Sequence, residues 1–139
     1  MSQQNVERMM EGLRAMERGD LEAIVAMADP EVEFVNPEDA LESGTRHGHD
    51  GLRVGLGAML EVFEDLRFEP ERVVENEDHV VAYGSFRARG RGSGMEVGPA
   101  PFAVLATLRD GKMARYEWFL DAEEALRAAG IPPDVGAGA

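Results

Sequence analysis

The chain has 139 residues, the size of a single domain built around one hydrophobic core. Its 14 basic and 27 acidic residues give a formal net charge of −13, which repels phosphate backbones and anionic lipids and argues against nucleic-acid and membrane partners. The absence of cysteine excludes disulfides and thiol chemistry. The sequence shows neither a signal-peptide pattern nor an apolar run of about 18 residues, so we expect a cytoplasmic protein.

The first predicted elements are two helices. Apolar residues recur at helical spacing from residue 3 to residue 18, and Gly19 is expected to end this helix. The inner face of the helix is rich in methionine, which is typical of a core and is also compatible with a pocket wall. Asp20 is predicted to cap a short second helix, which ends at Asp29-Pro30.

A short strand and a third helix follow. Residues 31–36 alternate, with Val32, Phe34 and Asn36 on one face, so that Asn36 is a polar group on an apolar face. Residues 37–47 are predicted to form an acidic loop. A helix is predicted from about Gly48, and three glycines within it would let it lie close to the sheet at some cost in helix stability.

The remaining chain is predicted to form four strands and a closing helix. The strands cover residues 66–76, 79–91, 95–109 and 112–120, with a bulge or kink at Pro99-Ala100-Pro101. Asp121 and Glu124 have the spacing of a capping-box variant, so the last helix is predicted to begin at Asp121. Residues 1–131 are therefore expected to form one domain, followed by a disordered C-terminal tail of residues 132–139.

The Asp110-Gly111 pair predicts a tight hairpin, because both residues tolerate the positive φ that a two-residue turn requires. Pairing Arg109 with Lys112 across this turn then determines which side chains share a face. One face is expected to look into a covered interior and holds Ala103, Leu105, Tyr116, Trp118 and Leu120. The other is expected to be solvated or to meet a partner subunit and holds Phe102, Val104, Ala106, Arg115, Glu117 and Phe119.

Several segments carry a resemblance to a known family: Gly19-Asp-Leu-Glu-Ala-Ile-Val-Ala-Met27, Asn36-Pro37, Gly48-His-Asp-Gly-Leu-Arg53, Asp65-Leu-Arg-Phe-Glu-Pro70, and Asp110-Gly-Lys112 with Phe119-Leu-Asp121. Through them the chain resembles, from about residue 5 to residue 131, a SnoaL-like member of the nuclear transport factor 2-like superfamily. The resemblance implies an α+β fold: a cone-shaped barrel of a curved antiparallel or mixed sheet, covered by N-terminal helices and completed by a closing C-terminal helix. It also implies an apolar pocket and a homodimer formed through the outer face of the sheet.

The ketosteroid isomerase chemistry found in this superfamily does not match the residues. That pattern requires a base carboxylate at the end of the first strand, where this chain has Asn36, and an amide cannot accept the proton at neutral pH. The positions of the two oxyanion donors fall near Gly12 and Ala103-Val104. We therefore do not expect this isomerase reaction.

Two other chemistries of the superfamily require other residues. The limonene-type epoxide hydrolase pattern requires Arg and Asp residues where this chain has Gly84, Phe86 and Trp118, so that reaction is not expected either. The polyketide cyclase pattern would use a single aspartate near the final strand, and Asp121 is the candidate for a catalytic residue. Its spacing to Glu124 favours a helix cap instead, but the cyclase alternative stays open.

The histidines and a run of arginines have simpler interpretations. His47, His49 and His79 do not have the spacing of a metal site, so we expect no metal and no other cofactor. Arginines at positions 87, 89 and 91 are predicted to form an exposed strand end, or alternatively a dimer contact.

The functional hypothesis is an apolar pocket that binds a small ring-containing or polyketide-like molecule. Its wall is predicted to consist of Phe34, Asn36, Ala82, Gly84, Phe86, Tyr116 and Trp118. Asn36 and Tyr116 are the expected hydrogen-bonding groups. Two alternatives remain: a cyclase- or isomerase-like enzyme acting on a small hydrophobic substrate, and a dimer module whose own side chains fill the interior.

Overall fold

The computed structural model describes residues 2–36, 44–119 and 121–132. In these ranges the chain forms α1 (Ser2–Arg18), α2 (Leu21–Ala26), β1 (Ala28–Asn36), β2 (Gly44–His47), α3 (Gly48–Val62), β3 (Phe63–Asn76), β4 (His79–Gly90), β5 (Glu96–Arg109), β6 (Lys112–Phe119) and α4 (Ala122–Ala128). The predicted α+β class is confirmed. Most of the predicted acidic loop (37–43) and most of the predicted tail (133–139) lie outside the described residues.

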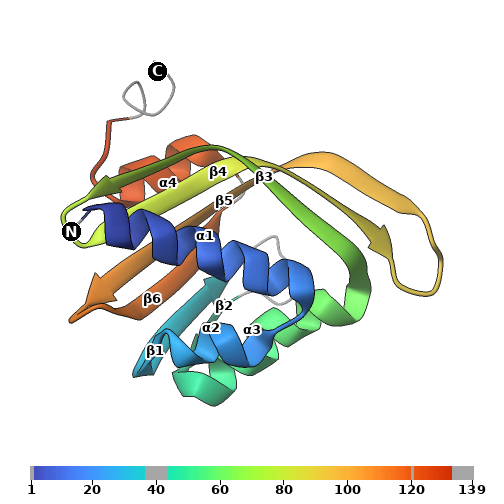
Figure 1. Cartoon of the computed structure of the whole chain (residues 1–139), viewed down its shortest axis with the longest axis horizontal. Coiled ribbons are helices and arrows are strands. Elements are labelled where there is room, and N and C mark those ends of the chain that lie inside the picture. Colours follow the sequence, from blue (N-terminus) through green and yellow to red (C-terminus); the bar gives the residue numbers. More distant parts are fainter. Residues whose placement is uncertain (1, 37–43, 120, 133–139) are drawn as a thin grey trace.

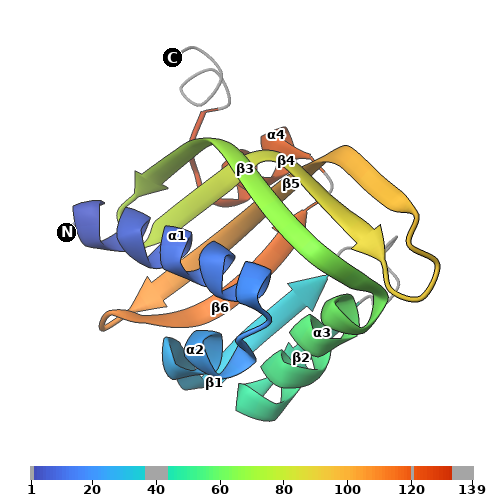
Figure 2. The same ribbon diagram turned by 45° about the vertical axis from the view of Figure 1, so that its right-hand side comes forward.

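The strands form one curved sheet in the order β2-β1-β6-β5-β4-β3. Strands β1 and β6 run parallel, whereas the other neighbours are antiparallel. The helices α1, α2 and α3 cover one face of the sheet and α4 covers the opposite face (Figures 1 and 2). The sheet stays open between β2 and β3, and its curvature together with the covering helices gives the predicted cone shape.

Strand β2 lies within residues 37–47, for which the sequence predicts a loop. It pairs antiparallel with β1, where Phe34 lies opposite Arg46 and Asn36 lies opposite Gly44. These four residues have no apolar alternation of their own, so the strand depends on its pairing with β1. Among the described residues, none of the helices combines the length and the apolar composition of a membrane span.

Both predicted aspartate caps are confirmed. The carboxylate of Asp20 accepts a hydrogen bond from the backbone N–H of Ala23 at 3.2 Å, at the start of α2. The carboxylate of Asp121 accepts from the N–H of Glu124 at 2.9 Å, at the start of α4. Each aspartate thus satisfies a backbone donor that the helix itself leaves unpaired.

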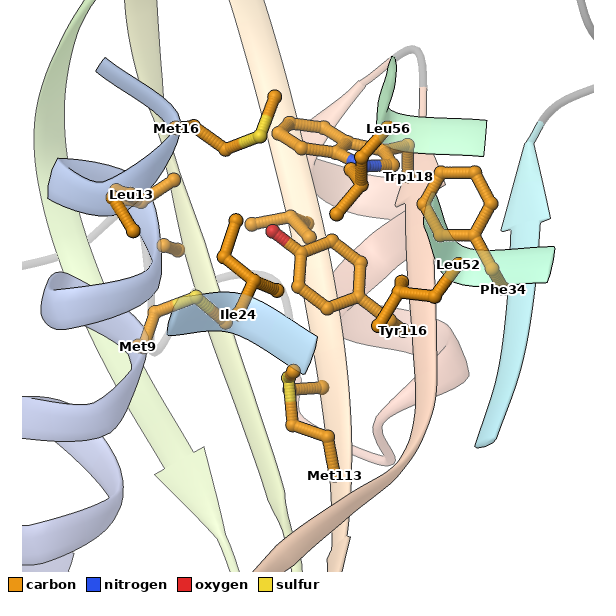
Figure 3. Close-up of a cluster of buried hydrophobic side chains, with 14 of the residues drawn as sticks. Met9, Leu13, Met16, Ile24, Phe34, Leu52, Leu56, Met113, Tyr116 and Trp118 are labelled. Atoms are coloured by element: carbon orange, nitrogen blue, oxygen red, sulfur yellow. The ribbon is translucent and has the colours of Figure 1, made fainter. Parts of the chain in front are cut away.

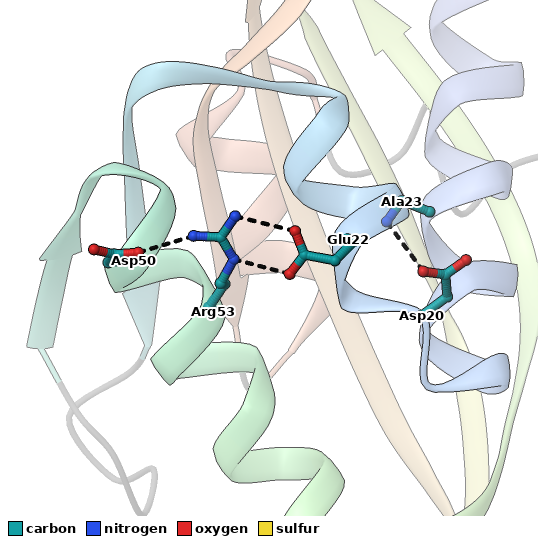
Figure 4. A network of polar contacts seen from close by, with 5 residues as sticks. All are labelled: Asp20, Glu22, Ala23, Asp50 and Arg53. Carbon is teal, nitrogen blue, oxygen red and sulfur yellow. Dashed lines mark hydrogen bonds and ion pairs between the residues drawn. The ribbon is translucent and has the colours of Figure 1, made fainter.

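An exposed network of charges connects α2 to α3 (Figure 4). Arg53 of α3 donates from Nε and Nη2 to the two carboxylate oxygens of Glu22 on α2, at 2.9 and 3.0 Å. Its Nη1 donates to Asp50 at 2.8 Å. The hydrogen bonds from Arg53 hold the pKa of Glu22 below its usual range.

The predicted hairpin turn is confirmed at its tip. Asp110 and Gly111 have φ angles of 53° and 78°, as a two-residue turn between twisted strands requires. Arg109 lies opposite Lys112, as predicted.

The predicted faces of β5 and β6 are wrong, because a bulge follows the turn. Leu108 lies opposite Met113, but Thr107 lies opposite Arg115, which leaves Ala114 as an extra residue in β6. One extra residue moves every later side chain of the strand to the other face. Consequently Tyr116 and Trp118 lie opposite Ala106 and Val104, not on the face of Ala103 and Leu105.

The side chains form two cores, one on each face of the sheet. The larger core packs helices α1, α2 and α3 against the strands. Ten of its residues are labelled in Figure 3, namely Met9, Leu13, Met16, Ile24, Phe34, Leu52, Leu56, Met113, Tyr116 and Trp118. The smaller core packs α4 against the outer face and contains Val81, Tyr83, Ala103, Leu105, Ala125, Leu126, Ala129 and Ile131. The face that was expected to be solvated or to meet a partner subunit therefore contributes Phe102, Val104 and Ala106 to the larger core.

Candidate functional site

A pocket of about 170 Å³ lies at one end of the larger core. Its lining residues come from helix α3 and from five of the strands, and they are Asn36, Met59, Phe63, Leu66, Phe68, Phe86, Pro101, Phe102, Trp118 and Phe119. We call this space the aromatic pocket. Among its described lining residues none is charged, and apart from Asn36 and the indole N–H of Trp118 the side chains are apolar.

Ring contacts connect the aromatic residues of this pocket. Phe68 is stacked with Trp118 at a centroid distance of 6.0 Å and an interplanar angle of 28°. The Phe68 ring also contacts the Phe102 ring edge to face, at a centroid distance of 5.1 Å. It is tilted against the Phe86 ring, at a centroid distance of 6.3 Å. Such contacts hold aromatic side chains in fixed orientations, so the pocket presents flat, largely preformed apolar surfaces.

Polar contacts outside the pocket hold two parts of its wall in place. Arg91, at the tip of the β4–β5 hairpin, donates from Nε to the carbonyl of Leu60 and from Nη2 to that of Phe63, both at 3.1 Å. These carbonyls lie at the C-terminal end of α3, where a cation is favourable. On α1, Glu17 accepts a hydrogen bond from the backbone N–H of Phe68 at 2.8 Å, at the edge strand of the sheet.

Three of the seven predicted wall residues line the aromatic pocket, namely Asn36, Phe86 and Trp118. Phe34 and Ala82 are buried in the larger core, where the Phe34 ring lies 5.9 Å from that of Tyr116. A Cβ on Gly84 would overlap backbone atoms of Glu69 and Glu71. The small size of Gly84 therefore allows the bulged strand β3 to approach closely and does not widen the pocket.

Tyr116 borders a different and much smaller space. Its side chain is 2% exposed, and it lines a void of about 10 Å³ beside α1. Burial raises the pKa of the phenol, so that the hydroxyl stays protonated at neutral pH. In Figure 3 this hydroxyl points toward the side of α1 and α2, away from Phe34.

Seven lining residues were not predicted from the sequence: Met59, Phe63, Leu66, Phe68, Pro101, Phe102 and Phe119. Phe102 was assigned to the opposite face because the bulge at Ala114 was not foreseen. The available signal in the sequence was the spacing of the large apolar residues Met113, Tyr116 and Trp118, which are the buried ones in β6. A step of three followed by a step of two does not fit an uninterrupted strand.

The other candidate residues lie elsewhere. Asp121 is exposed at the start of α4 and is not among the lining residues of the aromatic pocket. His49 lies 3.0 Å from the carbonyl of Ala28, and His47 lies 3.8 Å from Glu33. The described parts of the chain contain no group of three or more metal-ligating side chains suited to a metal ion.

Comparison with solved structures shows a shared fold. An NTF2-like protein of unknown function from Burkholderia pseudomallei matches with 23% identity and a TM-score of 0.75, over 93% of this chain and 98% of that one. A putative SnoaL-like polyketide cyclase from Jannaschia matches with 21% identity and a TM-score of 0.76, over 96% of both chains. TerC, crystallised with polyporic acid, matches with 28% identity and a TM-score of 0.73, over 91% of this chain and 97% of that one.

The sequence itself matches a family model. A comparison with curated proteins found no match. The model of the SnoaL-like domain, however, matches residues 6–116, which is most of the chain. The predicted resemblance is thereby confirmed, and the chain belongs to the SnoaL-like domain family, with a nuclear transport factor 2-like fold.

Proposed function

We propose that this protein binds a small, uncharged, ring-containing molecule in the aromatic pocket. The observation that carries the proposal is the composition of the pocket wall: six aromatic side chains, one amide and no charged residue among those described, around about 170 Å³. Burial of flat apolar surface supplies the affinity, and the Asn36 amide supplies a polar contact. An ionised ligand would lose its hydration without a countercharge on this wall.

The relatives support a ligand of this class. TerC has been crystallised with polyporic acid, and TerC is 28% identical to this chain over nearly the whole of both. Because polyporic acid has acidic hydroxyl groups, neutral steroids, aromatic polyketides and terpenoids are tested first, and polyporic acid is tested at a pH that keeps it protonated.

On this proposal the protein binds its ligand but does not catalyse the isomerase or epoxide hydrolase reactions known in the superfamily. Proton transfer requires a group of suitable pKa within hydrogen-bonding reach of the reacting atom. The described lining residues include no carboxylate and no histidine, which favours a binding role. The cyclase alternative would need Asp121, whose carboxylate is engaged in capping α4.

The test uses the emission of Trp118, the single tryptophan of the chain and part of the pocket wall. We expect a saturable change in emission with at least one compound of the panel. Met59→Ala, in the pocket wall, should weaken binding, whereas Met95→Ala, at a methionine that is 70% exposed, should not. A flat response from folded protein across the whole panel, or equal affinities of both variants, would count against the proposal.

Three further predictions remain part of this proposal. The homodimer implied by the family resemblance would give twice the mass of one chain in sedimentation equilibrium, and a single-chain mass would exclude it. A cytoplasmic location and the domain boundary at residue 131 also remain predictions from the sequence.

A further inference from the structure

The indole nitrogen of Trp118 is a buried hydrogen-bond donor without an acceptor. The side chain is 8% exposed and forms part of the wall of the aromatic pocket. An unpaired buried donor destabilises the folded state, and native proteins contain few of them. This donor belongs to a residue that lines the aromatic pocket, although the nitrogen atom itself is covered.

Tyr116 provides an internal comparison. Its hydroxyl is also buried without a partner, it lies two residues earlier on the same face of β6, and the two rings are 5.9 Å apart. Tyr116, however, is among the residues that line the void of about 10 Å³ beside α1, which is about the size of one water molecule. Of these two unpaired donors, only Trp118 belongs to a pocket that could hold a ring-sized molecule.

We propose that the ligand of the aromatic pocket carries a carbonyl oxygen, which accepts a hydrogen bond from Nε1–H of Trp118. This inference rests on the proposed function and narrows the ligand class to neutral ring compounds with a ketone or quinone-type oxygen. The nitrogen atom is covered by protein atoms, so the oxygen reaches it only when the pocket wall adjusts. Met59, a flexible side chain in that wall, can change shape without loss of regular structure.

The first test observes the donor directly. Because the chain has one tryptophan, its ¹H–¹⁵N spectrum contains one indole signal. The probes are 1-tetralone and tetralin, which share a two-ring skeleton and differ by the ketone oxygen. We expect 1-tetralone to bind about 5- to 10-fold more tightly and to shift the indole proton downfield, whereas tetralin binds without that downfield shift.

Two variants complete the test. Trp118→Phe keeps an aromatic ring but removes the N–H, so the ratio of the two affinities should fall to about one. Tyr116→Phe removes the unpaired hydroxyl of Tyr116, which does not line the aromatic pocket, and should leave the ratio unchanged. The test compares the affinities of the two probes for the same variant. A general loss of affinity in either variant therefore does not change the result.

The possible failures are distinguishable. If both probes bind wild-type protein equally and 1-tetralone leaves the indole proton unshifted, the carbonyl inference is overturned and the proposed binding function stands. A preference for 1-tetralone that survives Trp118→Phe also overturns the inference. If neither probe binds, the carbonyl inference fails, and if no compound of the panel described above binds either, the proposed function fails as well.

Discussion

Phe34 of β1 and Gly55 of α3 are in such close contact that an ideal Cβ on the glycine would overlap the phenylalanine ring. The ring cannot move aside, because Phe34 is 2% exposed and packed within the larger core. This contact sets how closely α3 lies on the sheet, and α3 carries Met59 of the aromatic pocket. The predicted role of the glycines in that helix is thus confirmed at Gly55.

Gly55→Ala should destabilise the protein by about 1–3 kcal/mol, the usual cost of inserting a group into a filled core. Gly57→Ala is the matched control in the same helix, because its Cβ would lie at an ordinary 3.6 Å from Leu21. That variant should gain up to about 1 kcal/mol from the higher helix propensity of alanine. The measurement is the free energy of unfolding in urea, and equal stabilities of the two variants would contradict the packing account.

Asp121→Ala should lower the free energy of unfolding by about 1 kcal/mol, because α4 loses its N-cap. Asp121→Asn should be nearly neutral, since asparagine caps helices as well as aspartate does. Both variants should retain the wild-type affinity for any compound that the Trp118 titration identifies. A loss of turnover in Asp121→Asn, in a folded protein shown to convert such a compound, would favour the cyclase alternative.

The ion pair between Glu22 and Arg53 should contribute stability that depends on pH. The pKa of Glu22 in the folded state is lowered by the hydrogen bonds from Arg53. The contribution is therefore present above the ordinary glutamate pKa of about 4.3, and it is lost as the pH falls through the lowered value. Glu22→Gln should have a lower Tm than wild-type protein at pH 7, and the difference should disappear at about pH 2.

The control for this prediction is Glu11→Gln, at an exposed glutamate in the middle of α1 that makes no ion pair with the described residues. Its Tm should follow that of wild-type protein at both pH values. A Glu22→Gln deficit that persists unchanged at low pH would show that the pair is not its cause.

Glu17→Ala should destabilise the edge of the sheet at Phe68. The carboxylate accepts from the backbone N–H of Phe68, which lies on an edge strand, and the loss of that acceptor should cost about 1–2 kcal/mol. Glu17→Gln keeps an acceptor oxygen and should lose less. Amide hydrogen exchange at Phe68 is the local measurement, and unchanged exchange in Glu17→Ala would refute the role assigned to this contact.

Local signals in the sequence were sufficient for most of the fold. The caps at Asp20 and Asp121 and the turn at Asp110-Gly111 are short-range features whose chemistry is the same in any context, and each is found as predicted. Strand β2 was missed because its pairing depends on β1 and not on its own residues. The family resemblance supplied the cone-shaped arrangement, which no short segment specifies.

The candidate site was less predictable, because it depends on register. The extra residue Ala114 moved Tyr116 and Trp118 to the face of Phe102, and it left Ala103 beneath α4. The aromatic pocket also combines side chains that are far apart in the sequence, such as Met59, Phe68 and Pro101. Alternation within one strand cannot show which residues of other elements complete a wall.

The most direct test of a ligand site in the aromatic pocket is a map of amide chemical-shift changes in ¹⁵N-labelled protein titrated with polyporic acid and 1-tetralone. The account predicts saturable shifts centred on the amides of Asn36, Phe86, Phe102 and Trp118, with the amides around Asn5 and Arg8 unchanged. Those two residues line a separate polar hollow of about 260 Å³ near the N-terminal end of α1. Shifts centred on Asn5 and Arg8, or no saturable shifts with either compound, would contradict the central claim.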